Sequence, residues 1–313
     1  IAPETTSLQG PTITNKPRPS FSGIAEADAD VRIYNGSAVL GTVRADANGL
    51  FNWTPAAPLA DGSYALRAEV EDAAGNLSSL SDTLNVRIDT VAPVMPVIEA
   101  PAAMADGYIA RSEALAGVLL QGTAEAGSTV SLKWQGQSTA FASVQADAQG
   151  RWQHSATLTQ FLQAGSGQAV LLAQSTDAVG NTSGQAQYTA QLLLSLPSVP
   201  TAQLDPQSQT GTSNSVTQDA TPTYRGRAPA NGQVLWYRDT NGNDQIDASE
   251  SVFAQASVGA DGQYTITLPA VAANSQHVWL VKAVDAAGNV SEGHTKVSLD
   301  VDTLPPQAQI GRA

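Results

Sequence analysis

A five-residue pattern, Asp-Ala-x-Gly-Asn, occurs three times along the chain at nearly constant spacing. Its copies lie at residues 72–76, 177–181 and 285–289, and each is followed within two residues by Ser or Thr. A spacing of about 105 residues is the size of one small domain, so the pattern indicates a tandem array of similar modules. Because each unit of such an array contacts only its neighbours, arrays present, space or bind partners more often than they catalyse reactions.

Short runs of alternating polar and apolar residues fill the stretches between the copies, whereas helical periodicity is nearly absent. Residues 31–34, 64–70 and 83–88 alternate with a period of two, which is typical of half-buried strands in antiparallel sheets. Gly, Pro, Asn and Asp interrupt these runs about every eight to twelve residues. The chain is therefore expected to be all-β and built of sandwich modules.

Two further internal matches fix the register of the modules. A tight turn that leads into a strand with an aromatic residue recurs at 46–53, 147–152 and 260–264. A loop that precedes the next strand recurs at 23–28, 122–127 and 226–231. The predicted modules span residues 1–91, 92–195 and 196–303, and residues 304–313 begin a following module.

The chain carries a net charge of −13, from 15 Lys and Arg against 28 Asp and Glu. This excess argues against nucleic acid or an anionic membrane as a partner and favours cations, calcium among them, as ligands. Cysteine is absent, which excludes thiolate metal sites, and no apolar run approaches the roughly 18 residues of a membrane-spanning helix. No signal peptide opens the chain at Ile1, so we interpret the sequence as an excerpt of a longer protein.

The order of the motifs resembles a known family. Gly-Thr-Ala-Glu-Ala-Gly, Asp-Ala-x-Gly-x-Trp, Asp-Ala-x-Gly-Asn-x-Ser and Ile-Asp-Thr-x-Ala-Pro are similar to the bacterial immunoglobulin-like (BIg) repeats of giant non-fimbrial adhesins exported by type I secretion, of the SiiE and biofilm-associated protein type. The resemblance covers nearly the whole chain, and residues 92–195 fit it best. It implies three tandem immunoglobulin-like Greek-key β-sandwiches in an elongated array. It also implies a calcium-stiffened extracellular stalk, with roles in adhesion, biofilm formation and virulence.

Residues 239–250 match the template of a calcium-binding loop. The template places side-chain oxygens at positions 1, 3, 5, 9 and 12 and a backbone carbonyl at position 7. The corresponding residues are Asp239, Asn241, Asn243, Asp247, Glu250 and, for the carbonyl, Gln245. Asp244 replaces the turn Gly, and its side chain is expected to face away. With three charged ligands, we expect a dissociation constant on the order of 10⁻⁵ to 10⁻³ M. The alternative is a hairpin turn rich in Asn and Gly.

A second calcium site is predicted between modules 1 and 2. In a seven-strand sandwich, loops B–C and F–G lie at the pole where the chain enters, and the last strand leaves at the opposite pole. Glu125 of loop B–C, Asp177 of loop F–G and Asp89 of the linker should therefore meet. Without a Lys or Arg nearby they would repel one another unless a hard cation bound them, with Asn181 and the carbonyl of Thr90 as further ligands. The alternative is that Asp merely caps its own turn.

The remaining poles are predicted to be unequal. Asp89 aligns with Asp302 but with Ser195 at the end of module 2, and Glu125 aligns with Pro229 or Ala230. The second junction then keeps only Asp285, so apolar packing and a proline-stiffened linker at 192–197 are expected there. The two outer poles keep half-sites, which consist of Glu26, Asp28 and Asp72 at the start of module 1 and of Asp300 and Asp302 at the end of module 3.

Other chemistry is not favoured. Trp53, Trp134, Trp152 and Trp236 lie on strands where sandwiches bury an aromatic residue, which favours core positions over a sugar-stacking platform. The three His have no repeating spacing that suggests zinc, and no Gly-x-Ser-x-Gly or other nucleophile motif suggests a hydrolase. No enzymatic activity is expected.

The sequence thus predicts a monomeric stalk segment, secreted to the bacterial cell surface, whose partners are neighbouring modules of its own chain. A host-cell surface ligand, either glycan or protein, would be bound farther out. Modules of about 40 Å each would give a rod of about 120 Å. Two alternatives stay open. The modules themselves would recognise host glycans if two or more Trp faced solvent on one side, or they would be accessory modules of a secreted enzyme.

Overall fold

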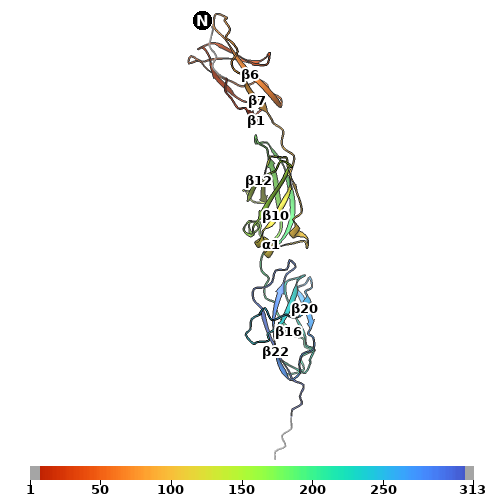
Figure 1. Ribbon diagram of the computed structural model, residues 1–313. Helices are drawn as coiled ribbons and strands as arrows, with labels where there is room; N and C mark the ends of the chain where they lie inside the picture. The colour runs from red at the N-terminus through yellow and green to blue at the C-terminus, as the bar shows by residue number, and fades with distance from the viewer. Residues whose placement is uncertain (1–7, 307–313) are drawn as a thin grey trace, which may run out of the picture.

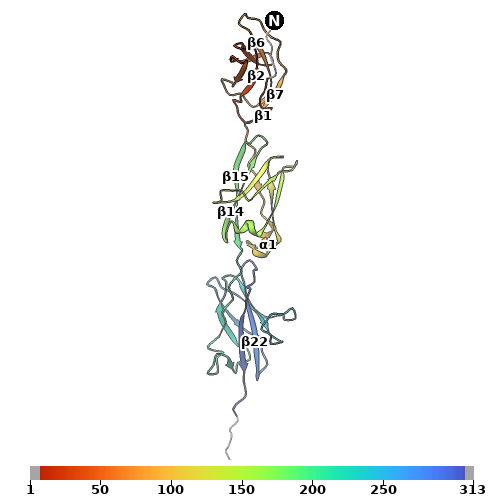
Figure 2. The same ribbon diagram turned by 90° about the vertical axis from the view of Figure 1, so that its left-hand side faces the viewer.

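The computed structural model describes residues 8–306, which form an almost entirely β structure. Figures 1 and 2 show three bodies in single file from two directions. Each body has its own cluster of buried side chains, within residues 8–88, 109–194 and 204–301. We call these bodies modules 1, 2 and 3. Residues 1–7 and most of the predicted tail at 304–313 lie outside the described residues.

Module 1 is a sandwich of two sheets. Its larger sheet has the order β1-β7-β6-β3-β4, and its smaller sheet pairs β2 with β5. The strands are β1 (Ile13–Thr14), β2 (Phe21–Ile24), β3 (Asp30–Asn35), β4 (Ala38–Arg44), β5 (Leu50–Trp53), β6 (Gly62–Glu71) and β7 (Leu84–Ile88). All neighbours are antiparallel except β1 and β7, which run parallel.

Module 2 repeats this arrangement with the sheets β12-β11-β14-β15-β9 and β13-β10-β8. Its strands are β8 (Val97–Ile98), β9 (Ile109–Ala110), β10 (Val118–Thr123), β11 (Thr129–Trp134), β12 (Ala142–Gln145), β13 (Arg151–Ala156), β14 (Gly167–Thr176) and β15 (Thr182–Leu193). Again one pair, β9 with β15, is parallel.

Module 3 has the sheets β17-β23-β22-β19-β20 and β16-β18-β21. Its strands are β16 (Gln203–Leu204), β17 (Val216–Thr217), β18 (Thr223–Arg227), β19 (Gln233–Arg238), β20 (Val252–Ser257), β21 (Gln263–Thr267), β22 (Ser275–Val284) and β23 (Thr295–Val301). The three modules thus share the strand order of the larger sheet, whereas the smaller sheet has two strands in module 1 and three in modules 2 and 3. Each module is an immunoglobulin-like β-sandwich.

Module 2 alone among the three adds short helices, which the sequence did not predict. They are η1 (Ala102–Met104), α1 (Arg111–Ala116) and α2 (Leu158–Leu162). Segments this short are below the length at which helical periodicity can be recognised. In α2, Phe161 is fully buried and the backbone carbonyl of Gln160 accepts a hydrogen bond from Trp134 Nε1 at 2.8 Å. Figure 1 shows α1 at the end of module 2 that faces module 3.

The tight turn that precedes β5 in module 1 and β13 in module 2 requires a Gly because of its backbone geometry. Gly49 and Gly150 have φ angles of 79° and 76°, in the left-handed region. A Cβ on Gly49 would lie 2.3 Å from the carbonyl oxygen of Ala25, and one on Gly150 would lie 2.5 Å from that of Ala124. A side chain is therefore excluded at both positions by conformation and by space.

The four tryptophans predicted to lie in the cores do so, and Trp279 is buried as well. Their exposed fractions are 4% for Trp53, 2% for Trp134 and Trp152, and 0% for Trp236 and Trp279. None of the helices in residues 8–306 is long and apolar enough to cross a membrane.

Candidate metal sites at the module junctions

The three Asp-x-x-Gly-Asn loops share one internal hydrogen-bond pattern. One carboxylate oxygen of the Asp accepts the backbone N–H groups two and four residues later, and the other accepts the side-chain amide of the Asn. These bonds measure 2.8–2.9 Å in the loop of Asp72, 2.7–2.9 Å in that of Asp177 and 2.9–3.0 Å in that of Asp285. Each Asp therefore caps its own turn, which is the alternative that the sequence left open.

In the loops of Asp72 and Asp177 these bonds also lower the pKa of the carboxylate. The hydrogen bond from the Asn76 side chain is the main cause that lowers the pKa of Asp72. For Asp177, burial would raise the pKa, but hydrogen bonds from the side chain and backbone of Asn181 and from Val179 and Gly180 outweigh it and lower the pKa below the ordinary value. Both groups are thus available as anionic ligands at neutral pH.

At junction 1, between modules 1 and 2, the three carboxylates expected to meet line one pocket of about 220 Å³. Asp89 comes from the end of module 1, whereas Glu125 and Asp177 come from two loops of module 2. Within residues 8–306, however, no three or more His, Cys, Asp or Glu side chains lie close enough together to hold a metal ion. The carboxylates therefore share the pocket without standing at ligand distance from one centre.

The expectation that no positive side chain lies near these carboxylates is wrong. Arg87, which also lines the pocket, donates from its guanidinium to Asp89 Oδ2 at 3.1 Å. The Arg87 side chain is 63% exposed, and exposed ion pairs of this kind are worth only about 0–1 kcal/mol. The pair can therefore open at little cost when a stronger cation competes for Asp89.

The two further residues expected at junction 1 have different surroundings. Thr90 donates from its backbone N–H and its hydroxyl to Asp61 Oδ1, both at 2.9 Å, which ties it to module 1. Asn181 Nδ2 donates to the backbone carbonyl of Asp89 at 2.9 Å, which links module 2 to module 1.

Strand pairing corrects the alignment of junction 2, between modules 2 and 3. The last strand of each module has a parallel and an antiparallel neighbour. Ile88 pairs with Thr14 and Gly62, Leu192 with Ile109 and Gly167, and Val301 with Thr217 and Ser275. The residue that follows in the chain is Asp89, Leu193 or Asp302, respectively. Leu193, and not Ser195, is therefore the equivalent of Asp89, and it also lacks a carboxylate.

Backbone hydrogen bonds likewise align the B–C loops of the three modules. Ala25, Ala124 and Ala228 each donate a backbone N–H to the repeated turn Gly of their module. The residue after each Ala is Glu26, Glu125 or Pro229, so Pro229 takes the place of Glu125 at junction 2. Of the predicted linker, Leu192 and Leu194 belong to the buried core of module 2. The apolar packing expected between the modules is thus packing within module 2.

The outer half-sites lie at the two ends of the row. Glu26 and Asp28 are exposed, and Asp28 has a φ of 59°, in the conformation that Gly127 has in module 2. At the far end, Asp300 pairs opposite Val216 in the sheet, and Asp302 Oδ1 accepts the N–H of Leu304 at 3.0 Å.

The loop at 239–250 connects β19 to β20, and its predicted ligands are linked by hydrogen bonds. Asn241 Nδ2 and Asn243 Nδ2 both donate to Asp247 Oδ2, at 2.6 and 3.0 Å. The Asn243 side-chain oxygen accepts the N–H of Gln245 at 2.9 Å. The network draws the residues of template positions 3, 5, 7 and 9 together.

The first and last positions of this loop accept backbone N–H groups. Asp239 accepts those of Gly242 and Asp244, at 2.7 and 3.1 Å. Glu250, only 7% exposed, accepts those of Thr240 and Asp247, at 2.8 and 3.2 Å. A donor set of three carboxylates, two amides and a main-chain carbonyl fits the oxygen preference of calcium.

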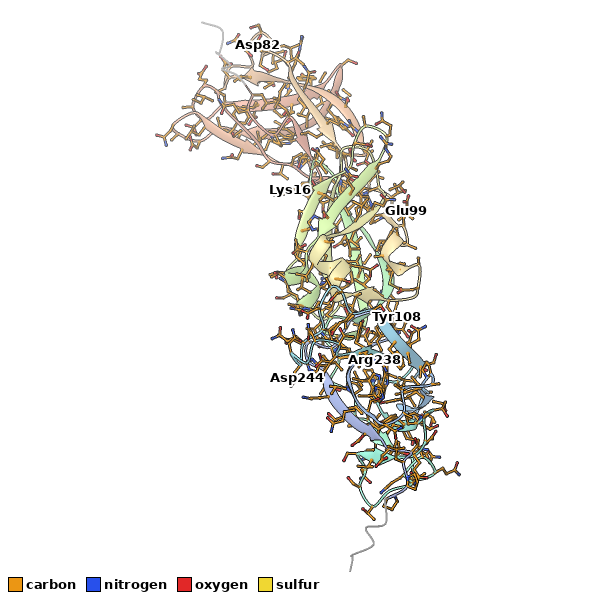
Figure 3. All side chains as sticks on the ribbon, turned by 60° about the horizontal axis from the view of Figure 1, so that its bottom comes forward. Lys16, Asp82, Glu99, Tyr108, Arg238 and Asp244 are labelled. Atoms are coloured by element: carbon orange, nitrogen blue, oxygen red, sulfur yellow. The ribbon has the colours of Figure 1, made fainter. Side chains whose placement is uncertain are left out.

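Asp244 behaves as expected for the residue at the sharp turn. Its φ is 59°, and its carboxylate pairs with Lys296 at 2.6 Å. The hydrogen bond from Lys296 is the main cause that lowers the pKa of Asp244. Figure 3 shows Asp244 on the side of module 3, and its ion-pair partner Lys296 lies on β23, outside the loop.

Replacing Asp239 by Asn and Glu250 by Gln together is expected to remove one calcium site and leave both junctions unchanged, because the loop lies within module 3. Calorimetric titration with calcium should show one site fewer than the parent chain. Asp261→Asn with Glu292→Gln, two exposed positions of module 3, removes the same charge outside the loop and should keep the parent stoichiometry. If the double variant binds as many calcium ions as the parent chain, residues 239–250 form only a turn.

Comparison with known proteins gives one family match. Residues 2–90 and 196–303 match the bacterial Ig-like domain family. The matched ranges leave out residues 91–195, so the prediction that module 2 fits the family best is not confirmed. The helices α1 and α2, which modules 1 and 3 lack within the described residues, set module 2 apart from them.

Solved structures similar to the chain include bacterial adhesins. One is a Ca²⁺-stabilised adhesin with which an Antarctic bacterium reaches out and binds ice (22% identity, 96% of this chain and 74% of that chain, TM-score 0.45). Another is a 1.5-MDa bacterial ice-binding adhesin (16% identity, 96% and 98%, TM-score 0.39). A third is a domain of a biofilm-associated protein (11% identity, 98% and 67%, TM-score 0.24). Comparison with curated protein sequences gives no match.

Proposed function

The chain belongs to the bacterial Ig-like domain family, and on that premise we propose that it is a calcium-stiffened stalk segment of a large bacterial surface adhesin. The observation that carries the proposal is the pocket at junction 1. There Asp89 of one module faces Glu125 and Asp177 of the next, in a molecule whose modules stand in single file. Carboxylates contributed by two bodies are suited to a cation that fixes one body against the other.

The mechanism is mechanical. Calcium supplies a hard positive charge that offsets the repulsion between Asp89, Glu125 and Asp177, and these residues would hold it. Holding both modules at one point removes hinge freedom, so that the stalk projects a distal binding region away from the cell. The residues of the loop at 239–250 would hold a further ion that stiffens module 3 locally. No catalytic step is part of this function.

The burial of all five Trp supports the stalk over the alternative of a glycan-binding tip. A tip that stacks sugars needs aromatic faces open to solvent, whereas no Trp here is more than 4% exposed. We further propose export by type I secretion, a place at the cell surface, a monomeric chain and a distal ligand on the host-cell surface. Accessory modules of a secreted enzyme remain the second alternative, and a catalytic domain in the same protein would favour it.

Thermal unfolding with and without calcium tests the proposal. An ion that binds only the folded chain stabilises it by about 2.7 kcal/mol per site at 100 times its dissociation constant. The unfolding midpoint should therefore be higher in millimolar calcium than in EDTA. Magnesium at the same concentration controls for ionic strength, because it demands a stricter geometry at shorter distances. Equal midpoints in calcium and in EDTA would contradict the proposal.

A further inference from the structure

The Asn that ends the repeated pattern contacts the preceding module at both junctions. At junction 1, Asn181 Nδ2 donates to the backbone carbonyl of Asp89 at 2.9 Å. At junction 2, Asn289 Nδ2 donates to the backbone carbonyl of Leu193 at 2.7 Å. Because the strand registers make Asp89 and Leu193 equivalent, the two Asn bind the same carbonyl, which belongs to the residue directly after β7 at junction 1 and to the last residue of β15 at junction 2.

The neighbouring Asp of the pattern orients this amide. In all three loops the Asp carboxylate accepts one of the two Nδ2 hydrogens. A carboxylate can only accept, so it selects the nitrogen side of the amide, and the second N–H then points out of the loop. In modules 2 and 3, which each follow another module, this outward N–H donates to a backbone carbonyl of the preceding module. The side chain of Asn289 is accordingly buried, that of Asn181 half-buried and that of Asn76 exposed.

Junction 2, which keeps only one of the three carboxylates of junction 1, has the more extensive Asn contact. Asn289 Oδ1 accepts the backbone N–H of Arg111, the first residue of α1, at 3.0 Å. The guanidinium of Arg111 donates in turn to the carbonyl of Leu194 at 3.1 Å. One amide of module 3 thus binds an N–H and a carbonyl from two separate segments of module 2.

We propose that the pattern Asn is an inter-module docking residue that holds consecutive modules in line without a metal. Its acceptor is the backbone carbonyl at the end of the last strand of the preceding Ig-like module. At junction 1 this contact acts beside the proposed calcium, and at junction 2 it acts in its place. The Asp cap, whose geometry is the same in all three loops, presents the amide in a fixed direction for docking.

Spin labels on the full chain can test the proposal in EDTA, where calcium has no part. The chain has no cysteine, so Gln187→Cys with Ser298→Cys, both exposed and on the last strands of modules 2 and 3, reports junction 2 alone. Asn289→Ala should broaden the distance distribution. Loss of one such hydrogen bond changes the ratio of docked to undocked forms about fivefold. Asn181→Ala should do the same for labels at Asn85→Cys and Gln187→Cys.

Asn76→Ala is the matched control, since it removes the same bond to Asp72 without any contact to another module among the described residues. It should leave both distance distributions unchanged. Asn289→Asp supplies a second, near-isosteric variant that cannot donate to Leu193 but keeps an oxygen for the N–H of Arg111. Asn76→Asp is its control, because it adds the same repulsion beside Asp72 that Asn289→Asp adds beside Asp285. Asn289→Asp should broaden the distribution while the Arg111 amide stays protected from hydrogen exchange, whereas Asn289→Ala should also expose that amide.

Two results would overturn the proposal: an unchanged junction 2 in both Asn289 variants, or equal broadening with Asn76→Ala. Unfolding midpoints of the Asn289 and Asn76 variants, measured alongside, separate loss of docking from loss of fold. Because every comparison is made in EDTA, failure here leaves the calcium proposal standing, and failure of the calcium proposal leaves this one standing.

Discussion

Calcium is expected to narrow and shift the distribution of distances between spin labels placed across junction 1. The distribution across junction 2 should stay unchanged. The pocket at junction 1 gathers three carboxylates that do not yet stand at ligand distance, so we expect binding to draw the linker of module 1 and the loops of module 2 together. At 100 times the dissociation constant, the bound arrangement gains about 100-fold over the free one. At junction 2, Leu193 and Pro229 replace two of the three carboxylates. Labels at positions 85 and 187, and at 187 and 298, measure the two junctions in the full chain.

Glu125→Gln should abolish the response of junction 1, because it removes one of only three anionic ligands. Glu99→Gln is the matched control, since Glu99 is an exposed carboxylate of the same module whose hydrogen bond goes to Gln121, away from the junction pocket. It should respond to calcium like the parent chain. Equal calcium-dependent shifts at both junctions would show that linker and loop carboxylates do not govern the response.

Trp236→Ala is expected to lower the free energy of unfolding by about 3–5 kcal/mol, the usual cost of removing a large aromatic side chain from a core. Trp236 is fully buried and packs against Tyr224 and Trp279, with ring centroids 4.8 and 6.2 Å away. Urea unfolding with tryptophan fluorescence and circular dichroism measures the loss. A change below 1 kcal/mol would mean that module 3 unfolds independently of this cluster.

Tyr224→Phe, in the same cluster, is expected to raise the free energy of unfolding. Among the described residues, the Tyr224 hydroxyl is buried without a hydrogen-bond partner, and burial raises its pKa. Removing an unsatisfied buried hydroxyl should stabilise the module by about 1 kcal/mol or more. Tyr264→Phe is the control, because the Tyr264 hydroxyl donates to the carbonyl of Thr201 at 2.7 Å and its loss should destabilise by about 1 kcal/mol. A stabilising Tyr264→Phe, or a destabilising Tyr224→Phe, would contradict this assignment.

The fold could be predicted from the sequence because its signals are local and repeated. The alternation of buried and exposed residues in strands such as β13 and β21, and the turn Gly at positions 49 and 150, each follow from two or three neighbouring residues. The helices α1 and α2 could not be predicted, because five or six residues carry no measurable helical period.

The candidate sites were predictable in position but less so in detail. Loop lengths and poles brought Asp89, Glu125 and Asp177 to one pocket, as the seven-strand topology requires. The ion pair of Arg87 with Asp89 has a sequence signal too, because side chains two residues apart on an extended chain lie on the same face. Ser195 lies two residues beyond the equivalent of Asp89, and the sequence does not reveal this because no turn signal marks the end of β15 at Leu193.

The docking role of Asn181 and Asn289 could not be derived from the sequence at all. It depends on where the last strand of one module ends relative to the first loops of the next, which is a matter of rigid-body placement. The only sequence signal was the repetition of Asn itself, and a good hairpin turn accounts for that equally well.

The parallel pairing of β1 with β7, of β9 with β15 and of β17 with β23 determines how the chain responds to a pulling force. Tension applied at the two ends of the chain pulls the earlier strand of each pair toward the N-terminal end of the row and the later strand toward the C-terminal end. Since the two strands run parallel, their hydrogen bonds are loaded in shear and must fail together. Arg87 N–H to Thr12 and Asp89 N–H to Thr14, both 2.9 Å, are two such bonds in module 1. Drag from flowing liquid would therefore be carried through folded modules instead of unravelling them strand by strand.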